Sequence, residues 1–362
     1  MTFQESVPLA PLTTLGVGGR ARFFAEARSA DDVAEALEFA SARGLAVFVL
    51  GGGSNTLVAD SGFDGLVIAM KSSGAIYEER GDRVLVTAEA GVAWDDLVAE
   101  TVSRGYSGLE CLSGIPGTVG GAVVGNIGAY GAQCSDKFVR ADAIDRARGG
   151  ALRAFAKDEC GFSYHDSMFG HAGGRFVLVR AMFELPKKGT SRPAYKDSRF
   201  DLEASTRAGA GAGAPTPARV RAEILRVRAE KGVLACSFKS AGSFFHMPFV
   251  SPEAYEHTAA VARALDAEKE ESLRPWAWKQ EDGAYKLAPG FLLEYTEFQK
   301  GYARGPVGIS PKHTLSIINI ADARASDVAR LARDMRDAVK RVFGVVLERE
   351  VEYVGEVEVR NA

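Results

Sequence analysis

One glycine-rich stretch, SGIPGTVGGAVVGNIGAYG at residues 113–131, limits most strongly what this chain can fold into. Seven of its nineteen residues are glycine, yet it also holds five apolar β-branched residues, Ile115, Val119, Val123, Val124 and Ile127. Disordered linkers lack such apolar residues. Glycine in this setting serves positive φ angles or a close approach of the backbone to another group. Successive free N–H groups in such a loop form a concave site for an anion.

Another glycine-rich loop, LGGGSN at residues 50–55, follows the apolar run at residues 46–50. It is the first glycine loop along the chain, and residues 113–131 form the second. Two such loops joined to strand-like sequence predict a phosphate-bearing ligand held largely by main chain. Neither loop has the GxGxxG or the GxxxxGK[ST] spacing, and no clear helix is expected after Gly114, Gly117 and Gly120. From spacing alone, a nucleotide diphosphate site and tight turns between packed strands both stay open.

Length and composition restrict the remaining possibilities. The 362 residues suffice for two or three domains, and the net charge of −3 without a basic run gives no support for a nucleic-acid partner. Four cysteines without CxxC spacing and five histidines without HExxH spacing predict no metal site and reduced thiols. The first residues lack a signal-peptide pattern, and no apolar stretch is long enough to cross a bilayer. We therefore expect a cytoplasmic protein.

Apolar periodicity and capping residues predict mixed helices and strands. A helix begins after Ser29 as N-cap and ends at Gly44, and another covers residues 93–103. Later helices are expected at residues 220–231, 252–271 and 326–342, the last with Ser326 as N-cap and Gly344 at its end. Strands are expected at residues 66–69, 84–88, 139–144 and 176–183, with a last strand pair at 345–347 and 351–354. The low-complexity run at residues 207–217 predicts an exposed loop.

A series of motifs resembles the UDP-N-acetylenolpyruvoylglucosamine reductase (MurB) family, in the family's order and through nearly the whole chain. The motifs lie at residues 13–19, 50–55, 113–131, 160–169, 241–245, 286–294 and 347–351. The resemblance implies an α+β fold of three lobes. Two lobes form an FAD-binding domain of the p-cresol methylhydroxylase and vanillyl-alcohol oxidase type, and the third is an α+β substrate domain. We expect residues 1–69 with 345–362, residues 70–232 and residues 233–344 to form them.

The resemblance also implies non-covalent FAD, with NADPH as co-substrate. No histidine precedes His165, so histidine attachment of flavin in either glycine loop is excluded, while attachment at Cys111 or Cys134 remains an alternative. The cofactor-binding residues carried over from the motifs are Leu50, Gly51, Gly52, Gly53, Ser54, Asn55, Ser113, Gly114, Ile115, Pro116, Gly117, Thr118, Gly120, Gly121, Asn126, Gly128, Ala129 and Tyr130.

The family reaction passes hydride from NADPH to flavin and then to C3 of an enolpyruvyl group, and a proton must reach C2. Ser243 matches the family's proton donor, with a turn-forming serine as the alternative. Glu350 matches the family's carboxylate, with Glu348 as its rival. His165 stands where the family has arginine, and its alternative role is a local bond to Asp166. The product would be UDP-N-acetylmuramate, used in peptidoglycan synthesis and thus in cell shape and division.

At the substrate-binding positions, this chain has only some of the residues that are usual in the family. Tyr164, Tyr195, Lys231 and His313 are the expected substrate-binding residues. His246 and Met247 replace the usual lysine and asparagine, and Pro311 and His313 replace the usual histidine and glutamine. A related FAD reductase acting on another UDP-sugar or a specialised metabolite is the second hypothesis, and a non-catalytic flavin protein is the third. We expect a monomer with no nucleic-acid or membrane partner.

Overall fold

The computed structural model describes residues 1–171, 174–189, 196–197, 200–201 and 215–357. Its N-terminal sheet has the strand order β1-β2-β5-β3. Strands β2 (Arg20–Ala27), β5 (Phe63–Met70) and β3 (Ala46–Leu50) are parallel, whereas β1 (Gln4–Pro8) is antiparallel to β2. The central strand β5 has six consecutive buried residues at its end, as is usual for a strand covered on both faces.

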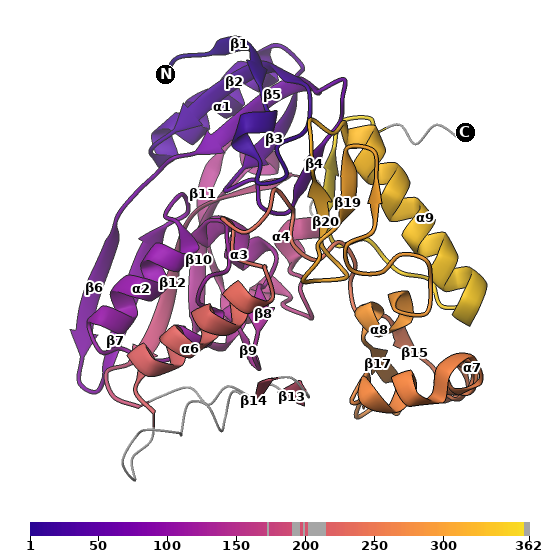
Figure 1. Ribbon diagram of the computed structural model, residues 1–362. Helices are drawn as coiled ribbons and strands as arrows, with labels where there is room; N and C mark the ends of the chain where they lie inside the picture. Colours follow the sequence, from indigo (N-terminus) through magenta and orange to yellow (C-terminus); the bar gives the residue numbers. More distant parts are fainter. Residues whose placement is uncertain (172–173, 190–195, 198–199, 202–214, 358–362) are drawn as a thin grey trace.

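Helix α1 (Ala30–Ala42) follows β2, and the Ser29 hydroxyl accepts a hydrogen bond from the Asp32 N–H at 3.1 Å, as expected of an N-cap. The second sheet is antiparallel with the order β11-β10-β12-β7-β6. Its strands are β6 (Ala75–Arg80), β7 (Arg83–Glu89), β10 (Phe138–Asp145), β11 (Ala151–Ala156) and β12 (Phe176–Pro186). Helix α1 contacts both sheets (Figure 1).

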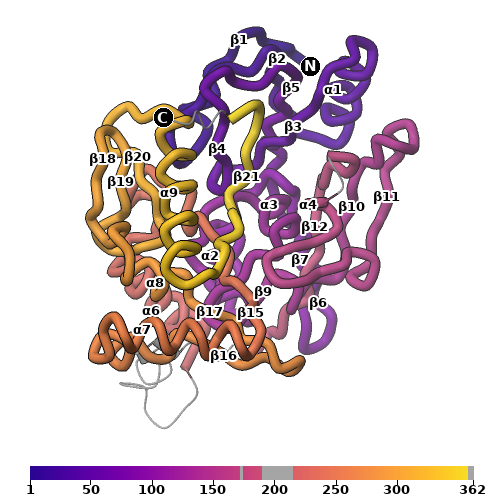
Figure 2. Tube along the Cα trace, turned by 90° about the vertical axis from the view of Figure 1, so that its right-hand side faces the viewer, coloured from indigo at the N-terminus to yellow at the C-terminus, as the bar shows by residue number. Residues whose placement is uncertain are grey.

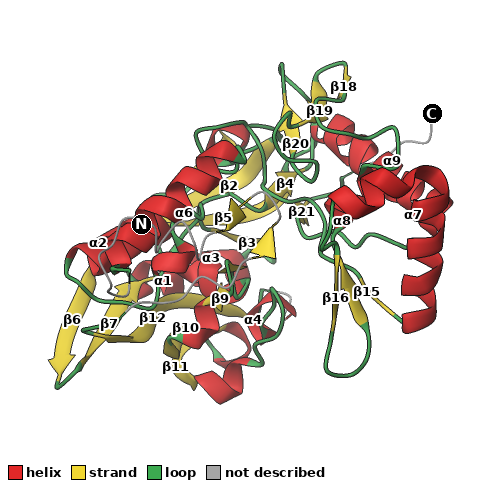
Figure 3. Cartoon of the chain, turned by 60° about the horizontal axis from the view of Figure 1, so that its bottom comes forward, coloured by secondary structure: helices red, strands yellow, loops and turns green. Residues whose placement is uncertain are grey.

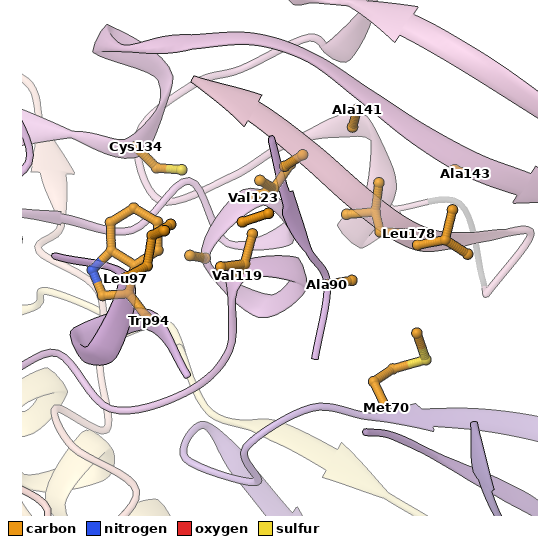
Figure 4. Packing of buried hydrophobic residues seen from close by; sticks show 14 of the residues in the cluster. Met70, Ala90, Trp94, Leu97, Val119, Val123, Cys134, Ala141, Ala143 and Leu178 are labelled. Carbon is orange, nitrogen blue, oxygen red and sulfur yellow. The ribbon is translucent and has the colours of Figure 1, made fainter. Parts of the chain in front are cut away.

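Helices and short strands complete this part of the chain. They are α2 (Trp94–Ser103), α3 (Val119–Val124), α4 (Met168–His171), α6 (Pro217–Glu230), β8 (Gly128–Ala129), β9 (Ala132–Gln133), β13 (Lys196–Asp197) and β14 (Phe200–Asp201). The largest apolar core lies between the two sheets and around α2 and α3, and Figure 4 shows Trp94, Leu97, Val119, Val123 and Leu178 within it. Trp94 is fully buried and its indole N–H donates to the Leu112 carbonyl at 3.1 Å.

The remaining elements build a second core. They are β15 (Phe249–Val250), α7 (Pro252–Ser272), β16 (Ala277–Lys279), β17 (Tyr285–Leu287), α8 (Pro289–Leu293), β18 (Ala303–Arg304), β19 (Val307–Ile309), β20 (Ile317–Asn319) and α9 (Ala325–Phe343). The buried stripe of α9 packs on Phe244, Phe245 and Leu292 in this core. Figure 3 shows α7 and the β15–β16 strands set apart from α1 and α2.

The C-terminal strand returns to the N-terminal part of the chain. β21 (Glu352–Val354) is parallel to β4 (Thr56–Val58), which follows the first glycine loop directly. Figure 2 shows the yellow β21 running beside β4. This pairing places the C-terminal segment next to the loop at residues 50–55.

The structure confirms most of the elements expected from the sequence and corrects four details. A six-residue helix, α3, does form within the second glycine loop, directly after Gly117 and Thr118, and the Thr118 hydroxyl caps it. Ser326 is not an N-cap, because the Asp60 carboxylate accepts the first N–H groups of α9 from Ala325 and Ser326. Residues 345–347 form no strand, and β21 pairs with β4 instead. Asp266 has non-helical angles and kinks α7.

Residues 207–214 of the low-complexity run lie outside the described residues. Helix α6 begins at Pro217, the last residue of that run. In the described chain, no helix combines the length and apolar character that a membrane crossing requires. The same residues contain no group of three or more histidine, cysteine, aspartate or glutamate side chains able to hold a metal ion.

Candidate active site

The two glycine loops contact each other backbone to backbone. A Cβ atom on Gly52 would lie 2.7 Å from the Gly117 Cα, and Gly117 itself has a φ of +121°. The Ser54 hydroxyl donates to the Pro116 carbonyl at 3.1 Å. Glycine is therefore required at both positions, because any side chain would force the loops apart.

The first loop presents unused backbone donors. Among the described residues, the N–H groups of Gly51, Gly52, Gly53 and Ser54 donate to no other protein group. Consecutive unpaired N–H groups in a turn make a concave site for an anion. The arrangement fits the diphosphate of FAD, which would be held there mostly by main chain.

A buried arginine beside the second loop supports the same assignment, and the sequence analysis missed it. Arg228 of α6 is 9% exposed, its Nη2 donates to the Val233 carbonyl at 3.1 Å, and its Nε has no partner in the described chain. A Cβ on Gly114 would lie 3.1 Å from that Nε. Burial lowers the pKa of the guanidinium, and an anionic group at Gly114 would satisfy it. Arg228 and Lys231, three residues apart at the end of a helix, were the available sequence signal.

The cysteines near the second loop are poor candidates for attaching flavin. Cys111 is 1% exposed and Cys134 is fully buried. Burial raises the pKa of the Cys111 thiol to about 12 and also raises that of Cys134. A thiol that stays protonated is a weak nucleophile, so non-covalent binding is the form these residues support.

His165 lies at the tip of a tight turn that the second loop holds in place. Ser163 and Asp166 exchange backbone hydrogen bonds across the turn, and His165 has a φ of +51°. The Asn126 amide donates to the Ser163 carbonyl at 2.7 Å, which anchors the turn. Asp166 instead pairs with His171 at 2.6 Å, so the expected alternative of a His165–Asp166 bond is wrong. A non-glycine residue at positive φ costs about 1 kcal/mol or more, which the turn contacts offset.

Ser243 and Glu350 reach the same place through a short antiparallel pairing. The Glu350 N–H donates to the Phe244 carbonyl at 3.0 Å, and the His246 N–H donates to the Glu348 carbonyl at 2.9 Å. The Asn55 amide donates to the Glu350 carbonyl at 3.2 Å, so the first glycine loop also fixes this segment. The two strands of this pairing come from opposite ends of the last third of the chain.

The Ser243 hydroxyl makes no hydrogen bond to another described residue. The turn before it is stabilised by Ser240, whose hydroxyl accepts from the Gly242 N–H at 3.1 Å. Ser243 is therefore not needed for the turn, and its hydroxyl is free to meet a ligand.

Glu350 lies between two histidines. Its Oε1 is 3.9 Å from Nδ1 of His165, and its Oε2 is 3.8 Å from Nδ1 of His246. Burial raises the pKa of Glu350 to about 7. Burial, together with His246 and Lys286, lowers the pKa of His165 to about 4. At neutral pH the carboxyl group is thus partly protonated while His165 is neutral. The rival Glu348 is exposed.

Lys286, the first residue of the motif at 286–294, adds a cation to this site that the motif alone does not indicate. Its Nζ is 3.5 Å from the centre of the Tyr164 ring and 5.7 Å from that of Phe249. Burial lowers the pKa of Lys286 to about 8, and no carboxylate among the described residues forms an ion pair with it. A half-buried cation without a carboxylate partner is suited to an anionic ligand.

The other expected residues lie around this centre or within the fold. Lys231 ends α6, and His313 Nδ1 is 3.4 Å from the Ser316 hydroxyl between β19 and β20. Tyr195 lies outside the described residues. Ser113 uses its hydroxyl to donate to the Glu110 carbonyl at 2.7 Å, and the Gly120 N–H donates to the Ala90 carbonyl at 2.9 Å.

We expect Gly52→Ala to weaken FAD binding, because its Cβ would meet Gly117 at 2.7 Å. Overpacking of this kind costs about 1–3 kcal/mol, which corresponds to roughly 5- to 150-fold in the dissociation constant. Titration of the FAD-depleted protein with FAD, followed by flavin fluorescence, measures the effect. Gly290→Ala is the control, because nothing lies within 4 Å of its added Cβ. Equal affinity of both variants would contradict the close-approach role of Gly52.

Comparisons with known proteins agree with this site. A family model described as "FAD binding domain" matches residues 21–154, and one described as "UDP-N-acetylenolpyruvoylglucosamine reductase, C-terminal domain" matches residues 235–354. The reductase of Thermobifida fusca is 40% identical over 98% of both chains. That of Pseudomonas aeruginosa is 38% identical over 97% of this chain and 98% of its own.

The solved structure of the reductase (MurB) from Thermus caldophilus matches with a TM-score of 0.66 and 26% identity, over 98% of this chain and 100% of that chain. These matches confirm the expected α+β fold class, with an FAD-binding domain of the p-cresol methylhydroxylase type followed by the reductase's C-terminal domain. They also confirm FAD as the cofactor. The chain belongs to the UDP-N-acetylenolpyruvoylglucosamine reductase family of FAD-dependent oxidoreductases.

Proposed function

We propose that this chain reduces UDP-N-acetylglucosamine enolpyruvate to UDP-N-acetylmuramate, with NADPH as the source of hydride. The observation that carries the proposal is the pairing of the Ser243 segment with the Glu350 segment, through the Glu350 N–H and the Phe244 carbonyl. The first glycine loop bonds the Glu350 carbonyl, the Glu350 carboxyl group lies beside His165, and the Lys286 cation lies against the neighbouring Tyr164 ring. Bound FAD supplies the hydride relay between NADPH and C3 of the enolpyruvyl group. The residues of the chain supply everything else.

The protein groups act on the charge that develops at the other end of the double bond. As C3 gains hydride, negative charge spreads from C2 into the substrate carboxylate, and C2 needs a proton. In our proposal the Ser243 hydroxyl gives C2 its proton, and the protonated Glu350 carboxyl group returns one proton to the resulting serine alkoxide, so that one proton in all leaves Glu350. His165 offers a hydrogen bond rather than the fixed positive charge of an arginine.

Substrate binding is assigned to the groups around this centre. Lys231 and Lys286 are suited to the diphosphate as point charges, and Tyr164 positions Lys286 through its ring. We propose that His313 and Tyr195 contact the substrate, as the resemblance to the family implies. The Lys286 contact is supported by the missing carboxylate partner described above.

A second candidate is reduction of another UDP-sugar or of a specialised metabolite by the same chemistry. The observation that favours it is the replacement of usual family residues by His165 and His246, which lie beside Glu350, and by Met247, which follows His246 in the chain. Because specificity resides in a few pocket groups rather than in the fold, these three residues are where the substrate would differ.

Anaerobic rapid mixing separates the candidates. The FAD-loaded protein is reduced with NADPH, and the enolpyruvyl UDP-sugar is then added while flavin absorbance is followed. Rapid reoxidation supports the first function. Normal reduction by NADPH followed by slow reoxidation favours the second, and failure of NADPH to reduce the flavin contradicts both.

Lys286→Met should raise the KM for the UDP-sugar by roughly tenfold or more while flavin reduction by NADPH stays unchanged. A hydrogen bond to a charged group contributes about 1.5–3 kcal/mol, and methionine keeps the aliphatic length of lysine. Steady-state kinetics at pH 7 measure the effect, with the exposed Lys279→Met on the neighbouring strand β16 as control. An unchanged KM would remove Lys286 from the substrate site.

The expected partners and organisation complete the proposal. We propose a monomer in the cytoplasm that takes part in cell wall biogenesis and has no nucleic-acid partner. We also keep the three lobes at residues 1–69 with 345–362, 70–232 and 233–344. The pairing of β21 with β4 supports the return of the C-terminal segment to the first lobe, although Val345, Leu347 and Val351 pack in the second core.

A further inference from the structure

The two histidines beside Glu350 have opposite electrostatic surroundings. His165 faces cations, because Lys286 and His246 both disfavour its protonation. Burial lowers the pKa of His246 as well, but there the carboxylates of Glu348 and Asp166 oppose the shift. Of the two rings that flank the carboxyl group, His246 is thus the one that accepts a proton more readily.

The geometry separates the two rings while keeping each within reach of Glu350. The ring centres of His165 and His246 are 6.4 Å apart and tilted by 52°. His246 Nδ1 lies 3.8 Å from Glu350 Oε2, about 1 Å longer than an ordinary hydrogen bond. A small closing movement or one shared water bridges that distance. The His246 side chain is 30% exposed, against 26% for Glu350, so the imidazole also has access to solvent.

We propose that His246 is a positioning residue that passes protons from water to Glu350 and so restores the protonated carboxyl group between turnovers. The inference rests on the proposed role of Glu350 as a proton donor. Neutral His246 takes a proton from water at one ring nitrogen, and the imidazolium then gives its Nδ1 proton to Oε2 of the Glu350 carboxylate. The imidazole returns to its neutral form, no other bond changes, and the net result is one proton moved from water to Glu350.

The groups packed around the pair set the pH range of this transfer. Glu350 faces both histidines and the phenol of Tyr164, whose pKa is raised by burial and by the charge of Glu350. His246 faces Glu348, Asp166 and Glu350. Interacting groups titrate as a coupled pair, so removing either member must shift the titration of the other.

NMR titration of the FAD-loaded protein tests the coupling without substrate. The chain has only five histidines, and comparison with His246→Gln assigns the His246 signal. We expect the His246 pKa to fall by at least about half a unit in Glu350→Gln, because a carboxylate beside the ring is lost, and not to move in Glu38→Gln, an exposed substitution on α1. An unchanged His246 titration in Glu350→Gln would overturn the inference.

Kinetics of His246→Gln give the functional test. We expect steady-state turnover to fall by at least about tenfold at pH 8, where Glu350 is mostly ionised, with a smaller loss at pH 6 and with flavin reduction by NADPH unchanged. Added imidazole should restore part of the rate, a result that a structural role would not give. The backbone N–H of His246 still bonds Glu348 in this variant, so the pairing is retained.

His257→Gln, on the exposed face of α7, is the matched control and should behave as the parent protein. Equal turnover of His246→Gln and the parent from pH 6 to pH 8 would also overturn the inference. If the parent itself does not turn over the UDP-sugar, the proposed function fails, while the substrate-free titration still decides whether His246 and Glu350 share a proton.

Discussion

Ser243→Ala is expected to slow reoxidation of the reduced flavin by the enolpyruvyl UDP-sugar by about 10²–10⁴-fold, the usual contribution of a positioned proton donor. Reduction of the flavin by NADPH should keep its rate, because that half-reaction needs no proton at C2. Anaerobic rapid mixing of each half-reaction measures both rates. The loss should appear in the rate constant rather than in the concentration of substrate that half-saturates it.

The structure indicates that Ser243→Ala removes the hydroxyl group without disturbing the fold. The Ser243 hydroxyl has no hydrogen bond to another described residue, and the turn before it depends on Ser240. Alanine should therefore fold as the parent does. Ser326→Ala is a matched control, because that side chain caps nothing in α9. Reoxidation of Ser243→Ala within about twofold of the parent would show that another group protonates C2.

Glu350→Gln should have the second large effect, and it has a distinctive pH dependence. In the parent, the rate of reoxidation should fall as the pH rises above 7, because the pKa of Glu350 is raised to about 7 and the donor form is lost. In the variant the rate should be lower by about 10²-fold and insensitive to pH in that range. Glu348→Gln, two residues away and exposed, is the control and should keep the parent profile.

The same substitution should stabilise the protein at alkaline pH. A carboxyl group whose pKa is raised by folding contributes stability below its unfolded pKa of about 4.5, and that contribution is lost as the pH rises to about 7. The loss amounts to at most about 3 kcal/mol. Denaturant unfolding at saturating FAD should therefore show a gain for Glu350→Gln over the parent that grows from pH 5 to pH 8. A pH-independent difference would contradict the raised pKa.

His165 changes the stability with pH in the opposite direction to Glu350. The Glu350→Gln variant must therefore be compared with the parent at each pH. Its pKa is lowered to about 4, so the stability it contributes is present above the unfolded value of about 6.5 and is lost as the pH falls toward 4. In the parent, the pH-dependent contributions of Glu350 and His165 to the free energy of unfolding partly cancel between pH 4.5 and 6.5. Subtracting the parent curve isolates the share of Glu350.

Local sequence was enough to predict the parts of the site whose role is fixed by backbone conformation. Gly52 and Gly117 are needed because the backbones of the two glycine loops are in contact. A run of glycines within apolar sequence indicates such a contact. The strands and helices could likewise be predicted from apolar periodicity, because this pattern also lies in the local sequence. Motif order added Ser243 and Glu350, which no periodicity would single out.

The remaining features depend on residues far apart in the chain. Asp60 caps α9 from 265 positions away, so the nearby Ser326 was the wrong choice. Lys286 meets Tyr164 only after β17 packs beside the turn at residues 163–166. Arg228 has an unpaired Nε only because α6 covers Gly114. Each depends on tertiary packing, which overrides local preference.

The pairing of Phe244 with Glu350 also determines when the protein becomes an enzyme during its synthesis. Both glycine loops precede Glu350 by more than 200 residues and leave the ribosome well before it. The segment that carries Glu350 emerges later and joins Phe244 and Asn55 by backbone and side-chain hydrogen bonds. Domains tend to fold as they are made, from the N-terminus onward. A nascent chain can thus hold both glycine loops and Ser243 before it has the Glu350 carboxyl group, and translation arrested before Glu350 leaves Ser243 without the acid that we propose beside it.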